Sequence, residues 1–354
     1  MDKHILTTEP FKTSRFSRRE FIRLDLNENS SVLKPIILKS ISRFSEFDIG
    51  AYPDYQDFTK SLAHDLGVNE SNICIFNGAD AGIVALLRLF ASSGDYVIMP
   101  IPTFGLYQVA VSMMGINAVT IPYTLENNKS FTFPIEKILS KLKGNTRALL
   151  LCNPNNPLGT SINNQDLNLL IKKCYELNIP IIIDEAYIEF SGSSALKFIT
   201  KYPNVIIIRT FSKYYGLAGL RLGLIISRPS IATELRKLRL PWGVSGFSVH
   251  AAKVILKHKK HFNSEASKLI KRKELLIKSL KTNGIRAFAS DTNFVLGYTT
   301  KPNKLVRELK KKKILISNMS HHQPSSIMKN MIRITIPSEA DFSKTVEAIT
   351  IAMN

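Results

Sequence analysis

Short apolar runs alternate with amphipathic stretches over the first two thirds of the chain. From about residue 56, "QDFTKSLAHDL" has helical periodicity, "ICIF" is a compact apolar run, and "AGIVALLRLF" is helical again. The alternation continues through "YVIMP", "NAVTIP", "RALLLC", "QDLNLLIKKCYEL", "IPIIID" and "NVIIIRT". Short apolar runs without polar alternation are typical of strands that are buried on both faces of a parallel sheet. We therefore predict an α/β architecture in which helices cover the sheet.

The pattern changes after Pro241. A long amphipathic helical region, at about 246–281, precedes short strands at "TNFVLGY", "KILIS" and "MIRITIP". Two further helical stretches follow the first and the last of these strands, at 303–311 and 339–352. This order of elements predicts a second, smaller α+β domain.

The chain of 354 residues has a net charge of +20. Its basic runs, "KHKKH", "KRK" and "KKKK", fall in helical stretches without the interleaved aromatic residues that single-strand nucleic-acid binding favours. We interpret them as solvated faces and expect no nucleic-acid partner. An arginine pair in "SRREFI", residues 17–22, is typical of an export signal, but the polar "RLDLNENSS" that follows excludes one. No apolar run is long enough to span a membrane. We expect a cytoplasmic protein.

Three cysteines, Cys74, Cys152 and Cys174, lie in apolar or helical contexts, and none has the spacing of a metal site. We predict free thiols and no metal.

Polar residues gather where the predicted strands end. "NGADAG", residues 77–82, follows a strand and opens a helix, so Gly78 allows a tight turn and the amides of Ala79 and Asp80 form an anion site. Alone, this motif is also compatible with an ordinary strand–helix turn. In a parallel sheet these ends lie at one edge, where ligands bind.

Other strand ends add polar side chains. "CNPNNPLGT" presents Asn156, and "IIIDEAYIEF" presents Asp184 and Tyr187, although Asp184 alone is also compatible with a helix N-cap. "RTFSKYYGLAGLRLG", residues 209–223, combines these groups: Thr210, Ser212, Lys213 and Arg221.

Taken together, the strand ends supply what pyridoxal 5′-phosphate (PLP) requires. The set contains an acidic partner for the pyridinium, donors for the phenolic oxygen, a lysine for the aldehyde and a cup for the phosphate. Nearby positive charge and burial should also depress the pKa of Lys213 and favour its neutral amine.

These motifs resemble the fold-type I PLP enzymes of the class I/II aminotransferase superfamily, above all the histidinol-phosphate aminotransferase group and its relative, threonine-phosphate decarboxylase. The resemblance extends from "LDLNEN" to "MIRITIP". It implies an aspartate aminotransferase-like fold, with a mainly parallel seven-stranded sheet between helices and a smaller α+β domain. The domains it implies are an N-terminal arm that joins the small domain (1–44), a large PLP-binding domain (45–245) and a small C-terminal domain (246–354).

The resemblance also implies roles for individual residues. Lys213 would be the Schiff-base lysine and proton shuttle, and Asp184 would pair with the ring nitrogen. Asn156 and Tyr187 would hydrogen-bond the ring oxygen. The phosphate would be bound by the Ala79 and Asp80 amides, Thr210, Ser212 and Arg221.

Four further residues match family positions. Phe104 would stack on the cofactor ring, and Tyr52 would reach the cofactor phosphate of the neighbouring subunit, which implies a homodimer. Arg333 would bind the substrate α-carboxylate as a bidentate fork, with Asn27 also at the substrate.

The chain departs from the family pattern at three places. "NENPYG" reads "NENSSV", and "NPTG" reads "NPLG". Members that act on phosphate esters usually carry an arginine in the strand that here reads "ILISN", where this chain has Ser317. His321 and His322 follow, and either solvation or contact with a different substrate tail is compatible with them.

The leading hypothesis is an aminotransferase that moves an amino group between a small amino acid or amino-phosphate and a keto acid. The alternative is a PLP-dependent decarboxylase of an amino-acid O-phosphate, because "LPWGVSGFS", residues 240–248, resembles threonine-phosphate decarboxylase. A PLP-sensing regulator would need a DNA-binding domain ahead of "LDLNEN", where only about 25 residues stand.

Overall fold

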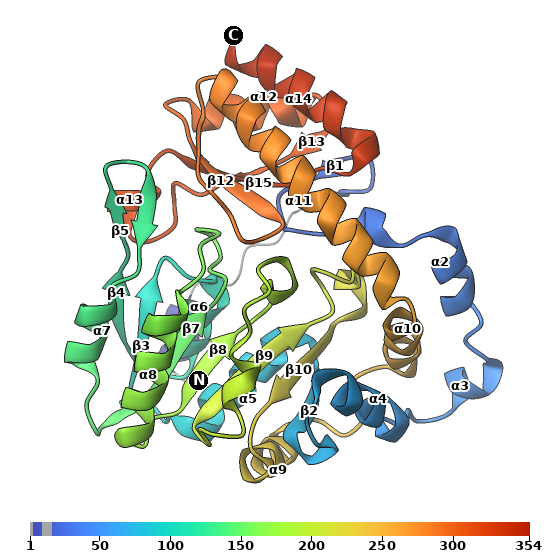
Figure 1. Ribbon diagram of the computed structural model, residues 1–354, viewed down its shortest axis with the longest axis vertical. Helices are drawn as coiled ribbons and strands as arrows, with labels where there is room; N and C mark the ends of the chain where they lie inside the picture. Colours follow the sequence, from blue (N-terminus) through green and yellow to red (C-terminus); the bar gives the residue numbers. More distant parts are fainter. Residues whose placement is uncertain (1–2, 9–15) are drawn as a thin grey trace.

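The computed structural model describes residues 3–8 and 16–354, so residues 1, 2 and 9–15 of the expected N-terminal arm lie outside the described part. A seven-stranded sheet forms the larger part of the molecule, and a smaller sheet lies above it (Figure 1). The strand order is β2-β10-β9-β8-β7-β3-β4, and the five strands from β9 to β4 are parallel. The mainly parallel seven-stranded sheet is thereby confirmed. Its strands are β2 (Ile73–Asn77), β3 (Tyr96–Ile101), β4 (Asn117–Pro122), β7 (Thr146–Cys152), β8 (Ile181–Asp184), β9 (Val205–Thr210) and β10 (Leu222–Ile226).

Helices cover both faces of this sheet because successive strand residues point to opposite sides. On one face, Ile182 packs in a cluster with α5, α6 and α9. On the other face, Ile181 and Ile183 pack in a cluster with α7 and α8, and α4 covers the β2 end. These helices are α4 (Gln56–Leu66), α5 (Gly78–Phe90), α6 (Gly105–Met113), α7 (Ile135–Lys141), α8 (Asn164–Glu176) and α9 (Pro229–Leu238).

One strand of the large sheet, β10, was not predicted. It runs antiparallel to both neighbours, β2 and β9. Arg221, just before it, adopts the left-handed conformation (φ 50°) and helps to reverse the chain. The apolar run "LGLII" was hidden because it directly follows the polar lysine segment.

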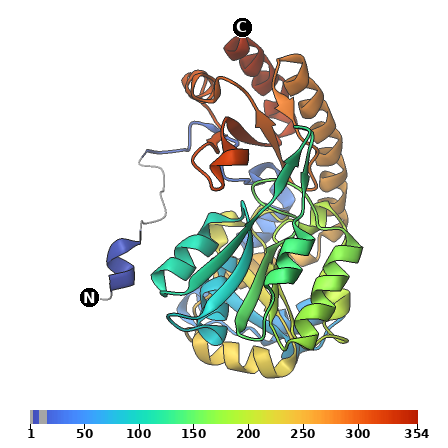
Figure 2. The same ribbon diagram turned by 90° about the vertical axis from the view of Figure 1, so that its left-hand side faces the viewer.

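The second sheet is antiparallel, with the order β11-β12-β15-β14. Its strands are β11 (Arg286–Ala287), β12 (Phe294–Tyr298), β14 (Ser317–Asn318) and β15 (Met331–Thr335). Helices α11 (Lys259–Thr282), α12 (Pro302–Lys311) and α14 (Glu339–Met353) pack against it. Figure 2 shows α11 running along the side of the molecule from the small sheet toward the large one.

Two predictions in this region need correction. The helical region expected at 246–281 is two helices, α10 (Gly246–Leu256) and α11, separated by Lys257 and His258. The expected strand "KILIS" is likewise divided, into β13 (Ile314–Leu315) and β14. The division has a structural reason, since β13 pairs with the N-terminal arm while β14 pairs with β15.

The N-terminal arm crosses to the small sheet. Its strand β1 (Ile22–Arg23) pairs in parallel with β13, and the Thr335 amide donates to Leu24 O at 2.9 Å. Beyond the arm, α2 (Pro35–Ile41) and α3 (Glu46–Gly50) both contact α10. The chain also includes α1 (Lys3–Thr7), which contacts α6.

A hairpin that was not predicted ties the two sheets together. It consists of β5 (Thr124–Glu126) and β6 (Ser130–Thr132), and α13 (Ser325–Met328) lies beside it in Figure 1. Phe131 of the hairpin packs in one apolar cluster with Phe288, Leu296 and Met328 of the small-sheet region.

The domain boundary expected between residues 245 and 246 stays a prediction. No helix in the described ranges combines the length and the apolar character that a membrane crossing requires.

Candidate active site

The ends of β8 and β9 and the start of α5 carry most of the predicted site residues. Asp184 is the last residue of β8, Thr210 is the last of β9, and Ala79 and Asp80 lie in the first turn of α5. Because β8 and β9 are parallel, their C-terminal ends lie at one edge of the sheet. The polar groups therefore converge as the sequence predicted.

Lys213 follows this edge and is held by the N-terminal arm. Its Nζ donates to Leu26 O at 2.9 Å. Burial, followed by the positive charge of Arg333, lowers the pKa of Lys213 to about 8. About a tenth of its amine is therefore neutral at pH 7, far more than for an ordinary lysine, and the neutral amine is the nucleophile.

Asp184 is a buried carboxylate with neutral donors. Tyr107 donates its hydroxyl to Asp184 Oδ2 at 3.1 Å, and the Ala186 amide donates to Oδ1 at 3.0 Å. Burial is the main cause that raises the pKa of Asp184 to about 6. A buried carboxylate that pairs with no cation among the described residues is suited to a cationic group such as a protonated ring nitrogen.

Hydroxyls and a guanidinium form a cup beside Lys213. Thr210 Oγ1 donates to Ser212 Oγ at 3.0 Å, and the Ser212 amide donates back to Thr210 Oγ1 at 3.1 Å. Arg221 Nη2 binds Asp80 Oδ2 at 2.6 Å. A Cβ on Gly78 would lie 2.6 Å from Arg221 Nη2, so only glycine leaves room for the guanidinium there.

A second glycine brings β10 close to the start of α5. A Cβ on Gly223 would collide with the backbone nitrogen of Ala79. The N-terminal amides of α5 therefore lie directly against β10, next to the Arg221 guanidinium. Helix N-terminal amides, hydroxyls and a guanidinium together fit a phosphate group.

A network of buried polar side chains lies between the two sheets. Asn27, in the left-handed conformation (φ 55°), donates from Nδ2 to the Tyr187 hydroxyl at 2.8 Å. Arg333 donates from Nη1 to Asn156 Oδ1 at 2.6 Å and from Nη2 to Asp25 O at 2.7 Å. Burial raises the pKa of Tyr187 and lowers that of Arg333.

Arg333 is not fully satisfied by these bonds. Its Nε is buried and has no hydrogen-bond partner among the described residues. Its charge acts on both Lys213 and Tyr187, so Arg333 belongs to the same electrostatic cluster. Its guanidinium carbon also lies 5.4 Å from the centre of the Phe294 ring. A buried arginine with an unpaired donor is suited to an anionic ligand.

Two predicted site residues, Phe104 and Tyr52, make no hydrogen bond or ion pair with the described groups at the strand ends. Phe104 precedes α6 and packs edge-on against Tyr107, with the ring centres 6.3 Å apart. Tyr52 comes two residues after α3, and α3 lies at the right-hand edge of the molecule in Figure 1, away from β8 and β9. Its ring is 77 % exposed and stacks on Trp242 at 4.4 Å. The chain therefore does not bring Tyr52 into its own candidate site.

The residues that depart from the family pattern also lie near Arg333. Ser317 is opposite Arg333 in the pairing of β14 with β15, and its hydroxyl donates to Asp25 O at 2.7 Å. His321 is exposed, whereas His322 is half-buried. Burial and the Arg333 charge lower the pKa of His322 to about 4, so its imidazole is neutral. The His322 side chain is therefore not fully exposed to solvent.

Several groups at the site were not found by sequence reasoning. The backbone carbonyls of Asp25 and Leu26 bind Arg333 and Lys213, and a carbonyl leaves no signal in the sequence. Tyr107 was also missed, although it lies one helical turn beyond Phe104, a spacing that could have indicated it.

The described ranges contain no group of three or more His, Cys, Asp or Glu residues arranged to hold a metal ion. All three cysteines are free and buried, as predicted.

Comparisons with known proteins agree with this geometry. A family model described as aminotransferase class I and II matches residues 19–349. The chain is 30 % identical over 324 residues to a histidinol-phosphate aminotransferase from Ruminiclostridium cellulolyticum, covering 90 % of this chain and 88 % of the relative.

Two solved structures are similar in fold. One is a histidinol-phosphate aminotransferase from Sinorhizobium meliloti in complex with pyridoxal-5′-phosphate, with a TM-score of 0.84 and 26 % identity, covering 94 % of this chain and 90 % of that one. The other is the L-threonine-O-3-phosphate decarboxylase from Porphyromonas gingivalis, with a TM-score of 0.79, 22 % identity, and coverage of 93 % and 98 %. At this identity the second likeness shows the fold alone. The chain belongs to the class I and II aminotransferase family.

Proposed function

We propose that this enzyme is a PLP-dependent aminotransferase that acts on a small amino acid or amino-phosphate, with a keto acid as the other partner. The observation that carries the proposal is the pairing of an amine and a buried acid at one sheet edge. Lys213 has its pKa lowered to about 8, and Asp184 has its pKa raised to about 6. This combination fits a cofactor with an aldehyde and a basic ring nitrogen.

When bound, PLP supplies an electron sink for the negative charge that forms at the substrate α-carbon. Asp184 would hold the proton on the ring nitrogen. Since Asn156 Oδ1 accepts from Arg333, the Asn156 amide nitrogen would be the atom that donates to the ring oxygen, together with the Tyr187 hydroxyl. Asn27 orients Tyr187 for this contact through its 2.8 Å bond.

The remaining roles are those that the family resemblance implies. Lys213 would bind the cofactor aldehyde through Nζ and would serve as the acid and base for the α-proton. Thr210, Ser212, Arg221 and the first amides of α5 would bind the phosphate, and Phe104 would pack against the ring face.

Arg333 is the candidate for the substrate anion. Its Nε has no hydrogen-bond partner among the described residues. Its Nη atoms now donate to Asn156 Oδ1 and Asp25 O, and they could donate to a substrate carboxylate instead. Ser317, directly opposite, offers a hydroxyl in place of a second guanidinium. Of the two substrate classes proposed, a small amino acid is therefore favoured over an amino-phosphate, because a phosphate ester would gain from a second arginine.

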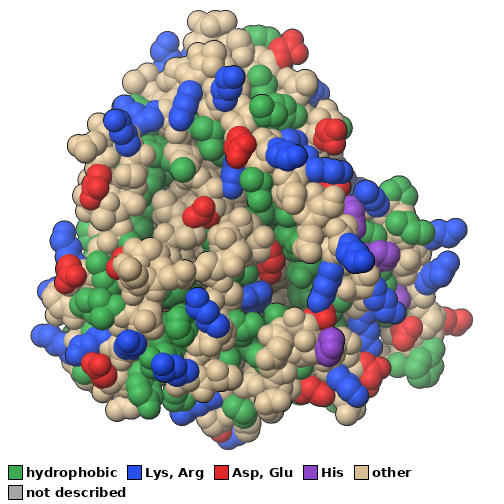
Figure 3. Space-filling model, viewed as in Figure 1, with side chains coloured by type: hydrophobic (Ala, Val, Ile, Leu, Met, Phe, Trp, Pro, Cys, Tyr) green, Lys and Arg blue, Asp and Glu red, His purple; other side chains and the backbone are tan. Residues whose placement is uncertain are grey.

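We also propose a homodimer. Exposed apolar side chains gather on α2, α3 and the segment before α10, and Figure 3 shows such side chains at the right-hand edge of the molecule. Phe47 is 80 % exposed, Ile49 72 % and Leu240 78 %. Tyr52 projects from this same surface, so a partner subunit would cover the patch and receive the tyrosine at its phosphate cup. The cytoplasmic location stays a prediction.

One experiment tests the reaction. Purified enzyme loaded with PLP is mixed with single amino acids and with amino-phosphates, without a keto acid. We expect the spectrum of the lysine-bound cofactor to be replaced by that of pyridoxamine phosphate, with a keto product and no CO₂. Rapid CO₂ release from a phospho-amino acid, with the cofactor spectrum unchanged, would instead establish the decarboxylase. If no substrate changes the cofactor and no product forms, the proposed reaction is wrong.

A further inference from the structure

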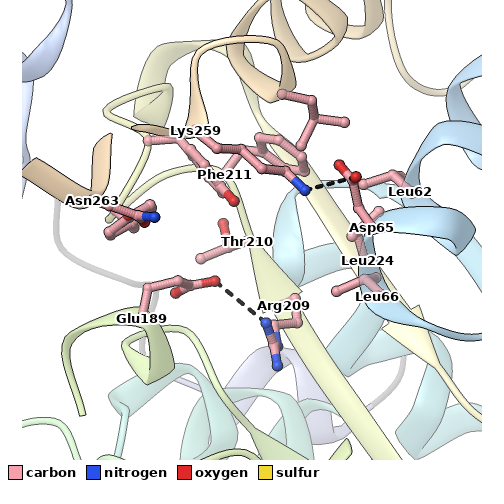
Figure 4. Close-up of a pocket in the computed structure, with 13 residues that line it drawn as sticks. Leu62, Asp65, Leu66, Glu189, Arg209, Thr210, Phe211, Leu224, Lys259 and Asn263 are labelled. Carbon is pink, nitrogen blue, oxygen red and sulfur yellow. Dashed lines mark hydrogen bonds and ion pairs between the residues drawn. The ribbon is translucent and has the colours of Figure 1, made fainter. Parts of the chain in front are cut away.

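A cavity lies behind the lysine segment, and among its lining residues only Thr210 has a role in the proposed reaction. It has a volume of about 300 Å³ and opens between α4, α11 and the short turn that contains Glu189 (Figure 4). Leu62, Phe211 and Leu224 supply apolar wall. Glu189 and Arg209 lie at one end. Thr210 lines the cavity as well, so an occupant would touch the strand end that leads to Lys213.

The carboxylate at the end of this cavity is poorly paired. Arg209 directs its guanidinium to Glu185, with contacts of 2.8 and 2.9 Å, and donates to Ser194 Oγ at 2.9 Å. Glu189 Oε1 receives a long contact of 3.5 Å from Arg209 Nη1. Glu189 Oε2 is buried and has no hydrogen-bond partner among the described residues. Glu189 lines the cavity, so its carboxylate can accept a hydrogen bond from an occupant.

Negative charge is also in excess there. At the rim, Lys259 and Asp65 pair at 2.6 Å and neutralise each other. At the inner end, the single charge of Arg209 faces two carboxylates, Glu185 and Glu189. When Glu189 is ionised, the three carboxylates outnumber the two cations by one, and the excess negative charge lies at the Glu189 end of the cavity.

We propose that this cavity binds a small protonated amine, which donates an N–H bond to Glu189 and packs its alkyl group against Leu62, Phe211 and Leu224. An anion is disfavoured by the excess negative charge, and a neutral alcohol would leave that charge unbalanced. A hydrated metal ion is also disfavoured, because it keeps its water shell and would make no favourable contact with the apolar wall. The site is distinct from the proposed reaction and does not rest on it.

Binding at this site is linked to pH. Burial is the main cause that raises the pKa of Glu189 to about 7, while the Arg209 charge opposes the shift. Asp65, Lys259, Tyr214 and Tyr215 are the other titratable groups that line the cavity. Below pH 7 a proton occupies Glu189 and competes with the amine, whereas above pH 7 the carboxylate is free. Affinity should therefore fall as the pH drops below about 7 and level off above it.

The test uses a tertiary amine, because a primary amine would also react with the PLP aldehyde. N,N-dimethylpropylamine carries one N–H donor when protonated and cannot form an imine. Calorimetric titration into the PLP-loaded enzyme should show one site per chain and release of a proton at pH 6. The affinity should weaken by up to about tenfold per pH unit below 7, as competition with one proton requires. Tetramethylammonium, with the same charge and no N–H, should bind at least about tenfold more weakly, since it lacks the charged hydrogen bond.

Two variants complete the design. Glu189→Gln should abolish the pH dependence and weaken binding at least about tenfold, because it removes the charge but keeps the shape. Asp65→Asn, at the rim of the same cavity, is the matched control and should change the affinity by less than about threefold. The cofactor absorbance should stay constant throughout the titration. Absence of saturable binding, equal binding of tetramethylammonium, or unchanged binding in Glu189→Gln would each overturn the proposal, and the first two need no variant.

Discussion

Arg333 and Asn156 are joined by a 2.6 Å hydrogen bond that links the small sheet to the loop after β7. Both side chains are buried, Arg333 to 8 % exposure and Asn156 to 7 %. One residue is the candidate for substrate binding and the other for cofactor binding. The two proposed functions are therefore physically connected rather than separate.

This connection predicts non-additive effects. Arg333→Ala should lower kcat/KM by roughly 100-fold, since bonds to a charged group contribute about 1.5–3 kcal/mol each. Asn156→Ala should lower it by about tenfold. The double variant should lose less than the product of the two, because each single change already breaks their shared bond. Arg286→Ala, an exposed arginine in the same sheet, is the control. Multiplying effects would show that the two residues act independently.

Lys213 should carry the cofactor. Reduction of the loaded enzyme with borohydride should attach PLP to Lys213 alone, and Lys213→Ala should retain no covalent cofactor. Lys213 is half-buried beside the phosphate cup, and its amine has a lowered pKa. Peptide mapping by mass spectrometry locates the label, with Lys201→Ala as the exposed control. A label on another lysine in the wild-type enzyme would make the assignment wrong.

The rate at which apoenzyme takes up PLP should depend on pH. The neutral amine is the nucleophile, so the rate should rise with pH through a midpoint near 8, the pKa of Lys213. After burial, the Arg333 charge is the next cause that lowers this pKa. Arg333→Ala should therefore shift the midpoint to higher pH and slow the uptake at pH 7. Stopped-flow absorbance measures the rate, and a midpoint that stays in place would contradict the role of Arg333.

Asp184→Asn should have opposite effects on stability and activity. The folded-state pKa of Asp184, about 6, is above its usual value of 3.8, so its favourable contribution is lost as the pH rises through 6. At pH 8, apoenzyme with a neutral amide should therefore melt at a higher temperature than the wild type. The loaded variant should lose at least about 100-fold in kcat, as expected for a group that maintains a required protonation state. A less stable apo variant would show that the carboxylate is not strained by burial.

The apolar surface beside α3 should form a subunit interface. Replacing both Phe47 and Ile49 with aspartate should give a monomer by light scattering, because these exposed side chains would be buried between subunits. The monomer should also bind PLP more weakly, since Tyr52 would no longer reach a partner. Leu169→Asp changes an exposed apolar residue on α8 and should leave the assembly intact. A wild-type monomer with full activity would exclude the dimer.

Local patterns predicted the strands and helices of the large sheet well, because buried isoleucine-rich runs such as "IPIIID" have few alternatives. The same reasoning missed β10 and the β5–β6 hairpin. β10 follows a polar functional segment directly, and the hairpin is stabilised by distant residues such as Phe288 and Met328. At the site, too, some groups could be predicted from local sequence and others could not. Side chains at strand ends were predictable, whereas the carbonyls that bind Lys213 and Arg333 depend on where the N-terminal arm lies in space.

The arm has a consequence for the order in which the site can form during synthesis. The Asn27 amide bonds to Thr335 Oγ1, 308 positions later in the chain, and β1 pairs with β13. Until the ribosome has produced these late strands, the arm has no partner on the small sheet, and Lys213 lacks its carbonyl acceptor. Closing so long a loop is slow relative to local folding. The nascent large sheet can therefore be complete while the catalytic centre is still open, and the arm is among the last segments to reach its final position.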